Sequence, residues 1–139
     1  MKKILLIMIF LTSIVSAQVE YSTNLKDGKT IGFSVDVGGF KSSVPNKTRM
    51  DFFVQVPYSS IQFVKKDDGF YANYNITLSF TDESKMNIIF ERNWKEKVKT
   101  IDFEQTLSSE NFNLSYKTYD LNPGKYFVKC IVEDSDSRA

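Results

Sequence analysis

The stretch GFYANYNITLSF, residues 69–80, is the clearest structural signal in the chain. Its apolar side chains recur at every second position, and mostly polar residues stand between them. A period of two sends successive side chains to opposite faces of an extended strand. The stretch therefore predicts a β-strand with one face in a hydrophobic core, formed by Ala72, Tyr74, Ile76, Leu78 and Phe80.

The same alternation recurs on both sides of this strand, in short runs separated by turn residues. No apolar pattern of period 3.6 is long enough to predict a helix. About seven strands with one apolar face each predict an all-β fold of two packed antiparallel sheets, with a closed barrel as the alternative. Trp94 and the set Phe112, Leu114 and Tyr116 are predicted to face the core. The other predicted strands span residues 31–37, 50–56, 61–64, 88–98, 101–107, 112–116 and 126–132, of which 101–107 is the weakest.

The segment LNPGKY, residues 121–126, places a tyrosine just after a Pro-Gly turn at the start of the last predicted strand. This arrangement is typical of the tyrosine corner, in which the hydroxyl bonds to nearby backbone, and it favours an immunoglobulin-like or fibronectin-like sandwich. Such topologies place one more strand after this one, and without it a neighbouring strand has an unpaired edge. We favour a chain that is a fragment lacking its final strand; the alternative is a partner strand that fills the gap.

The N-terminus reads as a cleavable secretory signal. Lys2 and Lys3 precede the apolar run ILLIMIFL, and Val15 and Ala17 are the small residues expected before a cut at Gln18. A membrane anchor is the alternative, but a spanning helix needs about 20 apolar residues. The predicted organisation is a signal peptide at 1–17, a linker at 18–30, a β-sandwich at 31–134 and a polar tail at 135–139. The expected location is the periplasm or the outside of the cell, with no membrane span after cleavage.

Composition excludes several classes of function. The chain contains no His and only one Cys, so His-based catalysis, His-ligated metals and multi-Cys zinc sites are excluded. Residues 18–139 hold 16 basic and 17 acidic residues, a balance that offers no basic field for nucleic acid. Cys130 alternates with valines and is predicted to be a buried thiol. We predict no catalytic residue, no metal and no cofactor, because the short acidic pairs read as solvated turns or tail.

From about Phe33 onward, the chain resembles the N-terminal β-sandwich region of exported bacterial GWxTD domain-containing proteins. The resemblance rests on Arg49–Phe63 (RMDFFVQVPYSSIQF), Gly69–Ala72, Trp94–Val98 (WKEKV) and Leu121–Tyr126 in that order. The motif that names the family is absent, since Trp94 is the only tryptophan. The resemblance implies an exported β-rich protein, and it carries no catalytic residues to this chain.

Four aromatic residues fall on predicted outer faces and form the candidate binding surface: Phe53, Tyr71, Tyr119 and Phe127. The leading hypothesis is a non-catalytic module that binds a protein partner, or a downstream domain of the same parent protein, in an envelope or secreted assembly. The alternative is a carbohydrate-binding module, because exposed aromatic rings stack on sugars. An enzyme that uses carboxylates alone ranks last, since no acidic pair can be placed together from sequence.

Overall fold

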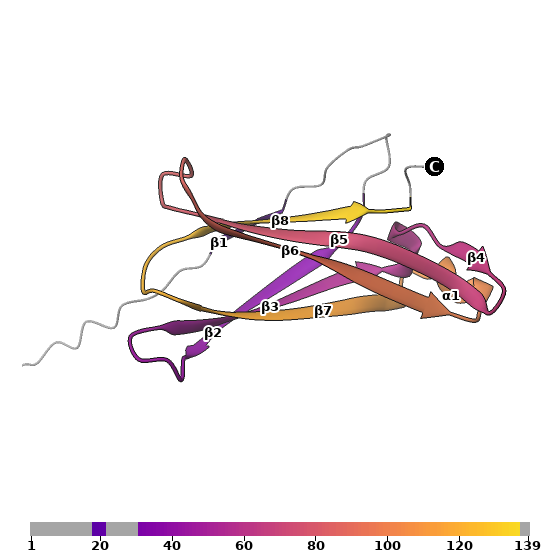
Figure 1. Cartoon of the computed structure of the whole chain (residues 1–139), viewed down its shortest axis with the longest axis horizontal. Coiled ribbons are helices and arrows are strands. Elements are labelled where there is room, and N and C mark those ends of the chain that lie inside the picture. The colour runs from indigo at the N-terminus through magenta and orange to yellow at the C-terminus, as the bar shows by residue number, and fades with distance from the viewer. Residues whose placement is uncertain (1–17, 22–30, 137–139) are drawn as a thin grey trace, which may run out of the picture.

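The computed structural model describes residues 18–21 and 31–136, which form two β-sheets packed face to face (Figure 1). The predicted signal peptide lies outside the described residues, as do positions 22–30 and 137–139. The all-β antiparallel sandwich of about seven strands is confirmed, and the two sheets stay separate rather than closing into a barrel. The elements are β1 (Gln18–Tyr21), β2 (Ser34–Lys41), β3 (Thr48–Pro57), η1 (Tyr58–Ser60), β4 (Val64–Lys66), β5 (Gly69–Thr81), β6 (Ile88–Thr100), α1 (Phe103–Thr106), β7 (Phe112–Leu121) and β8 (Phe127–Asp134).

The larger sheet is organised around β5, the strand of the opening motif. Antiparallel β6 pairs along one side of β5, while β4 and then β8 pair along the other side. β1 continues this sheet beyond β8, and it pairs with β8 in parallel. The smaller sheet has the antiparallel order β2-β3-β7.

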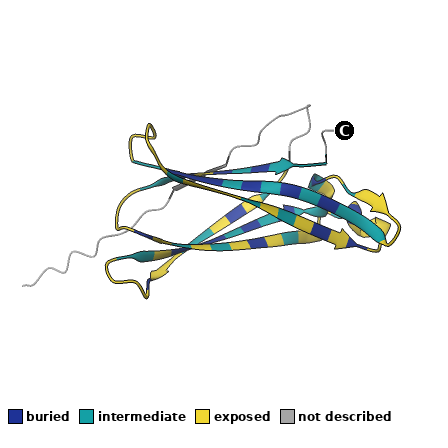
Figure 2. Ribbon diagram, viewed as in Figure 1, coloured by how far each residue is buried: buried dark blue, intermediate teal, exposed yellow. Residues whose placement is uncertain are grey.

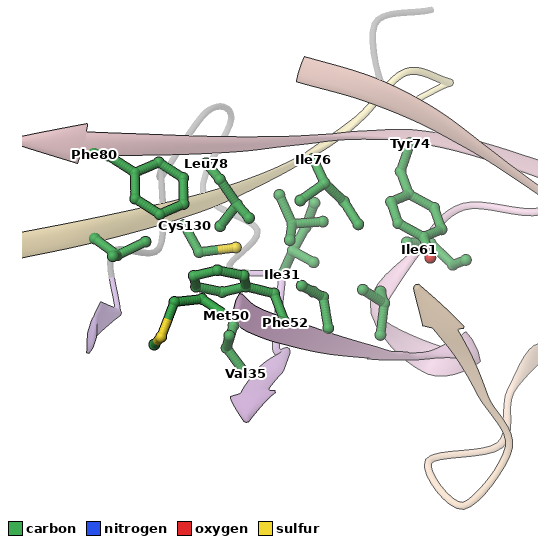
Figure 3. Close-up of a cluster of buried hydrophobic side chains, with 14 of the residues drawn as sticks. Ile31, Val35, Met50, Phe52, Ile61, Tyr74, Ile76, Leu78, Phe80 and Cys130 are labelled. Carbon is green, nitrogen blue, oxygen red and sulfur yellow. The ribbon is translucent and has the colours of Figure 1, made fainter. Parts of the chain in front are cut away.

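The core lies between the sheets and is built by the inward faces of β3, β5 and β8 (Figure 3). The apolar alternation of β5 is realised as predicted, because Tyr74, Ile76, Leu78 and Phe80 are each 0% exposed. The ring of Phe80 packs edge to face against the ring of Phe52, which comes from the other sheet. The two ring centroids lie 5.4 Å apart. Figure 2 shows this alternation along β5, where buried positions recur through the middle of the strand.

Two predicted segments differ from the structure. Residues 101–107 form a turn and the short helix α1 rather than a strand, because the Asp102 carboxylate accepts the Glu104 N–H at 2.9 Å and caps the helix. In β7, the predicted orientation is wrong over the first half of the strand. Leu114 and Tyr116 point outward and are about half exposed, while Ser115 faces inward at 3% exposure.

The edge beside the last strand is covered. β1 pairs with β8 in the register Gln18↔Phe127 to Tyr21↔Cys130. The predicted linker at 18–30 therefore begins with a strand that joins the sheet, because the outer edge of β8 would otherwise lack a partner there. At the other end of β8, the predicted polar tail also begins with ordered contacts, since the Ser135 N–H donates to Asn73 O at 2.9 Å.

The turn between β7 and β8 forms as its sequence predicts. The Tyr126 hydroxyl donates to the backbone carbonyl of Asn122 at 2.8 Å, which confirms the predicted bond from the tyrosine to nearby backbone. The bond spans the Pro-Gly turn and fixes the crossing from the smaller to the larger sheet.

Candidate functional site

A polar network joins the two sheets where β6 faces β7. The Trp94 indole N–H is shared between Glu96 Oε1 and Ser115 Oγ, each at 2.9 Å, and the Ser115 hydroxyl donates to Glu96 at 2.6 Å. The Lys117 ammonium lies 5.4 Å from the centre of the Trp94 ring. These contacts satisfy the polar groups of a half-buried tryptophan, so the network holds the sheets together.

A second hydrogen bond between the two sheets lies nearby and also satisfies a buried polar group. Asn113 Nδ2 donates to the Tyr74 hydroxyl at 2.6 Å, and burial raises the pKa of Tyr74 to about 12. A tyrosine with that pKa stays protonated near neutral pH and is a poor general base. This bond therefore satisfies the polar end of a buried tyrosine across the two sheets.

Ser115→Ala is expected to lower the free energy of unfolding by about 1–2 kcal/mol, because it removes a bridging hydroxyl and leaves Glu96 with fewer donors inside the sandwich. Urea denaturation of the purified variant measures the change. The matched control is Ser109→Ala, at an exposed loop position, which should change stability by less than about 0.5 kcal/mol. Equal values for the two variants would show that the network does not stabilise the fold.

The remaining reactive groups among the described residues are buried or have structural partners. Burial raises the pKa of the Cys130 thiol to about 12, so it stays in the unreactive thiol form. No group of three or more metal-ligating side chains occurs within 18–21 and 31–136. The acidic pairs have structural partners: Asp68 accepts bonds from Tyr71 and Lys99, and Asp136 accepts from the Asn73 amide.

An apolar hollow opens at the end of the sandwich beside the Pro-Gly turn. Its internal volume is only about 20 Å³, and its walls include Met50, Phe52 and Leu121. Its one ionisable wall group is the Tyr126 hydroxyl, which is already bonded to backbone. The hollow therefore lacks the convergent polar groups that give a small-molecule site its specificity.

The most unusual surface feature is an apolar patch on the outer face of the smaller sheet, here called the β3–β7 patch: Phe53, Phe112, Leu114 and Tyr116. Phe53 and Tyr116 are register partners on adjacent strands, and their rings lie 4.9 Å apart. Leu114 and Phe112 continue the row along β7, and they are 50% and 48% exposed. The outward face of an antiparallel sheet is normally polar, so a contiguous apolar row of this kind is the candidate for an interaction surface.

The charged residues around the β3–β7 patch are mainly acidic. Exposed Asp36 on β2 is the register partner of Phe53, and exposed Asp120 lies further along β7. Arg49 is the one cation among the outward-facing residues of β2, β3 and β7. It pairs with Asp51 at 3.2 Å, and its guanidinium lies over the Phe40 ring. The patch therefore has a net acidic border on this side.

The structure separates the four residues that the sequence predicted as one binding surface. Phe53 lies outward, within the β3–β7 patch. Tyr119 was wrongly placed on an outer face: its ring packs 5.9 Å from Phe52 and 5.7 Å from Phe80 at the border of the core. It turns inward because β7 extends to Leu121, whose side chain is buried on the same face.

Tyr71 and Phe127 lie at opposite ends of the larger sheet. Phe127 is the register partner of Thr81, ten residues beyond Tyr71, which corresponds to about 30 Å. Cations cover both rings. Lys66 and Lys99 lie 5.0 and 5.2 Å from the Tyr71 centroid, and Lys85 lies 4.2 Å from that of Phe127. These two residues therefore form no common surface with Phe53.

Sequence reasoning missed Phe112, Leu114 and Tyr116 because it assigned the apolar set of β7 to the core. The opposite face of β7 carries Asn113, Ser115, Tyr119 and Leu121. Each face of the strand therefore has apolar residues along one half of its length. The correct orientation of β7 could have been inferred from the residues that face it, since a buried Tyr74 and a half-buried Trp94 each require a polar group opposite.

Comparisons of the chain with models of protein families, with curated proteins and with solved structures found no match. Among the described residues, no helix has the length and apolar character needed to cross a membrane.

Proposed function

We propose that this chain is a non-catalytic, exported module that binds another protein through the β3–β7 patch. The observation that carries the proposal is the row of half-exposed apolar side chains from Phe112 to Tyr116 on a solvent-facing sheet surface. The predicted export signal and the resemblance to GWxTD domain-containing proteins support a role in an envelope or secreted assembly.

The chemistry of the patch specifies its partner. Large apolar and aromatic side chains at the centre favour an apolar counterpart, and tyrosine is among the residues that contribute most to binding free energy at interfaces. The exposed carboxylates of Asp36 and Asp120 favour basic residues at the border of that counterpart. The proposed partner is a folded exported protein, or a downstream domain of the same parent protein, with an apolar surface bordered by Lys or Arg.

Replacing both Leu114 and Tyr116 by lysine is expected to weaken binding at least 100-fold, because the changes remove two central contacts and place cations against a basic border. The mature chain, immobilised, is used to recover proteins from an envelope extract and from spent medium of the source organism. The affinity of a recovered, purified partner is then measured by titration calorimetry with each variant.

The matched control is Ser43→Lys, which adds the same charge at an exposed position in the loop between β2 and β3, outside the patch. This control should retain binding within about threefold, and all variants should keep the thermal unfolding midpoint of the parent. Equal affinity of the Leu114/Tyr116 variant and the parent chain for the purified partner would contradict the proposal.

Carbohydrate binding is the second candidate, favoured by the exposed rings of Phe112 and Tyr116 on the same face of β7. Rings in such a row stack on successive sugar units. Specific binding on a glycan array that disappears with Tyr116→Ala would establish this function in place of protein binding. The absence of binding to any polysaccharide would remove it.

A further inference from the structure

The outer edge of β8 is closed in a way unlike any other edge of the larger sheet. β1 supplies it with four residues, and this is the one parallel pairing among the described strands. The donor sequence Gln-Val-Glu-Tyr alternates polar and less polar residues, and its register sets Val19 opposite Val128 and Tyr21 opposite Cys130. Both β8 partners are buried in the core, at 4% and 0% exposure.

The opposite edge of the same sheet is protected by charge instead. The outward face of β6 carries Lys95, Lys97 and Lys99, and all three side chains are exposed. Lysines on an edge strand oppose the addition of a further strand. β8 has apolar residues on both faces, Val128 and Val132 inward and Phe127 and Ile131 outward, and its register with β5 contains no bulge. The outward face of β8 carries a single lysine, Lys129, against three on β6, so its edge is the better suited of the two to receive a strand.

We propose that the outer edge of β8 is a strand-binding site, and that the Gln18–Tyr21 segment of a second copy of this chain binds there in place of the chain's own β1. A second copy is the occupant that the structure specifies, because the segment already seated on the edge is one that every copy carries. A neighbour's segment in the same register forms the same backbone hydrogen bonds, as in domain swapping.

The covalent connection permits such an exchange. Nine residues, 22–30, separate β1 from the next described residue, Ile31, and a chain of that length spans up to about 35 Å when extended. Since the bonds are the same in either arrangement, the ratio of exchanged to closed chains depends on protein concentration relative to the effective concentration of the tethered segment, on the order of 1 mM. Exchange therefore increases as the protein becomes concentrated.

A disulfide trap tests the proposal in the mature chain. The donor carries Glu20→Cys and the acceptor carries Lys129→Cys, each in a Cys130→Ala chain, because Glu20 is the register partner of Lys129, which is exposed, whereas the buried Cys130 thiol is unreactive. Neighbouring strands lie about 4.8 Å apart, which is within the range of Cα separations that disulfides span. Mild oxidation of the mixture is expected to give a covalent dimer of one donor and one acceptor, seen on a non-reducing gel. The yield should rise at least fivefold between about 10 µM and 1 mM protein.

A second acceptor makes the test specific for register. Ile131→Cys, also in a Cys130→Ala chain, places the thiol on the same face of β8 as Lys129 but two residues further along. The Glu20→Cys donor should link to the Lys129→Cys acceptor and not to the Ile131→Cys acceptor, because two residues correspond to about 7 Å along a strand and carry the Cα atoms beyond the distance that a disulfide spans. Random collision would not reproduce this selectivity.

A chain that carries both cysteines distinguishes pairing within one chain from pairing between two chains. Glu20→Cys and Lys129→Cys together in one Cys130→Ala chain report pairing within that chain. Links within single chains together with no links between donor and acceptor would overturn the proposal. Equal yields from matched and mismatched pairs would also overturn it, because the crosslinks would then arise without strand addition. Circular dichroism of each variant confirms that the sandwich is intact.

Discussion

Phe80→Ala is expected to lower the free energy of unfolding by about 4 kcal/mol, because it removes a fully buried ring and leaves a cavity between the sheets. Phe80 is 0% exposed, stacks on Phe90 at 4.1 Å and meets Phe52 and Tyr119 edge to face. A domain of this size has a total stability of about 5–15 kcal/mol, so the variant should lose between about a quarter and four fifths of it. Guanidinium denaturation followed by tyrosine and tryptophan fluorescence measures the loss.

The control for this variant removes the same ring from the surface. Phe112→Ala deletes an aromatic side chain that is 48% exposed on β7, and it should change stability by less than about 1 kcal/mol. Losses of equal size in the two variants would mean that the aromatic cluster around Phe80 does not form the centre of the core.

The fold was predictable where the two faces of a strand differ clearly in polarity. In β5, every apolar residue from Ala72 to Phe80 could be assigned to the core from alternation alone, and each is buried. The same holds for Val54 and Val56 of β3, which are both 0% exposed. Burying one apolar face determines the register of such strands, so local pattern and global packing agree.

Alternation could not predict the strand that carries the candidate site. β7 has Leu114 and Tyr116 on one face and Tyr119 and Leu121 on the other, so the pattern alone does not show which face is buried. The choice depends on tertiary partners, namely the polar ends of Tyr74 and Trp94 that Asn113 and Ser115 satisfy. A functional surface that is itself apolar contradicts the rule that places apolar residues inside, and the patch was missed for that reason.

The covered edge of β8 shows a different limit of sequence reasoning. The sequence indicated that the last strand needs a neighbour, and a missing C-terminal strand or a partner strand was expected to provide it. In the structure, the neighbour is β1, more than a hundred residues earlier in the chain. Four residues give too short a period-two pattern to be recognised as a strand, and pairing between distant segments leaves no local signal.

Alkaline pH is expected to destabilise the protein steeply between pH 9 and 12, chiefly through Cys130. Burial raises the pKa of its thiol from 9.0 to about 12. Above pH 9 the unfolded chain loses this proton and the folded chain retains it. The stability that is fully present below pH 9 is therefore lost as the pH rises toward 12. Three pKa units correspond to about 4 kcal/mol, and Tyr74 acts in the same direction between pH 10 and about 12.

The variant Cys130→Ala separates the thiol from every other group that titrates in this range, because all of the others remain in both proteins. At pH 7 the variant should be less stable than the parent by about 1–2 kcal/mol, since it loses a buried sulfur. At pH 11 it should be more stable by about 1 kcal/mol, because at that pH the parent has lost about 2.7 kcal/mol of stability as the thiol ionises in the unfolded chain while it stays largely protonated in the folded chain. The order of stability therefore reverses near pH 10, which urea denaturation at a series of pH values will show. A difference between the two proteins that stays constant from pH 7 to pH 11 would mean that the thiol is not desolvated in the folded state, and that the inward face of β8 is open to water.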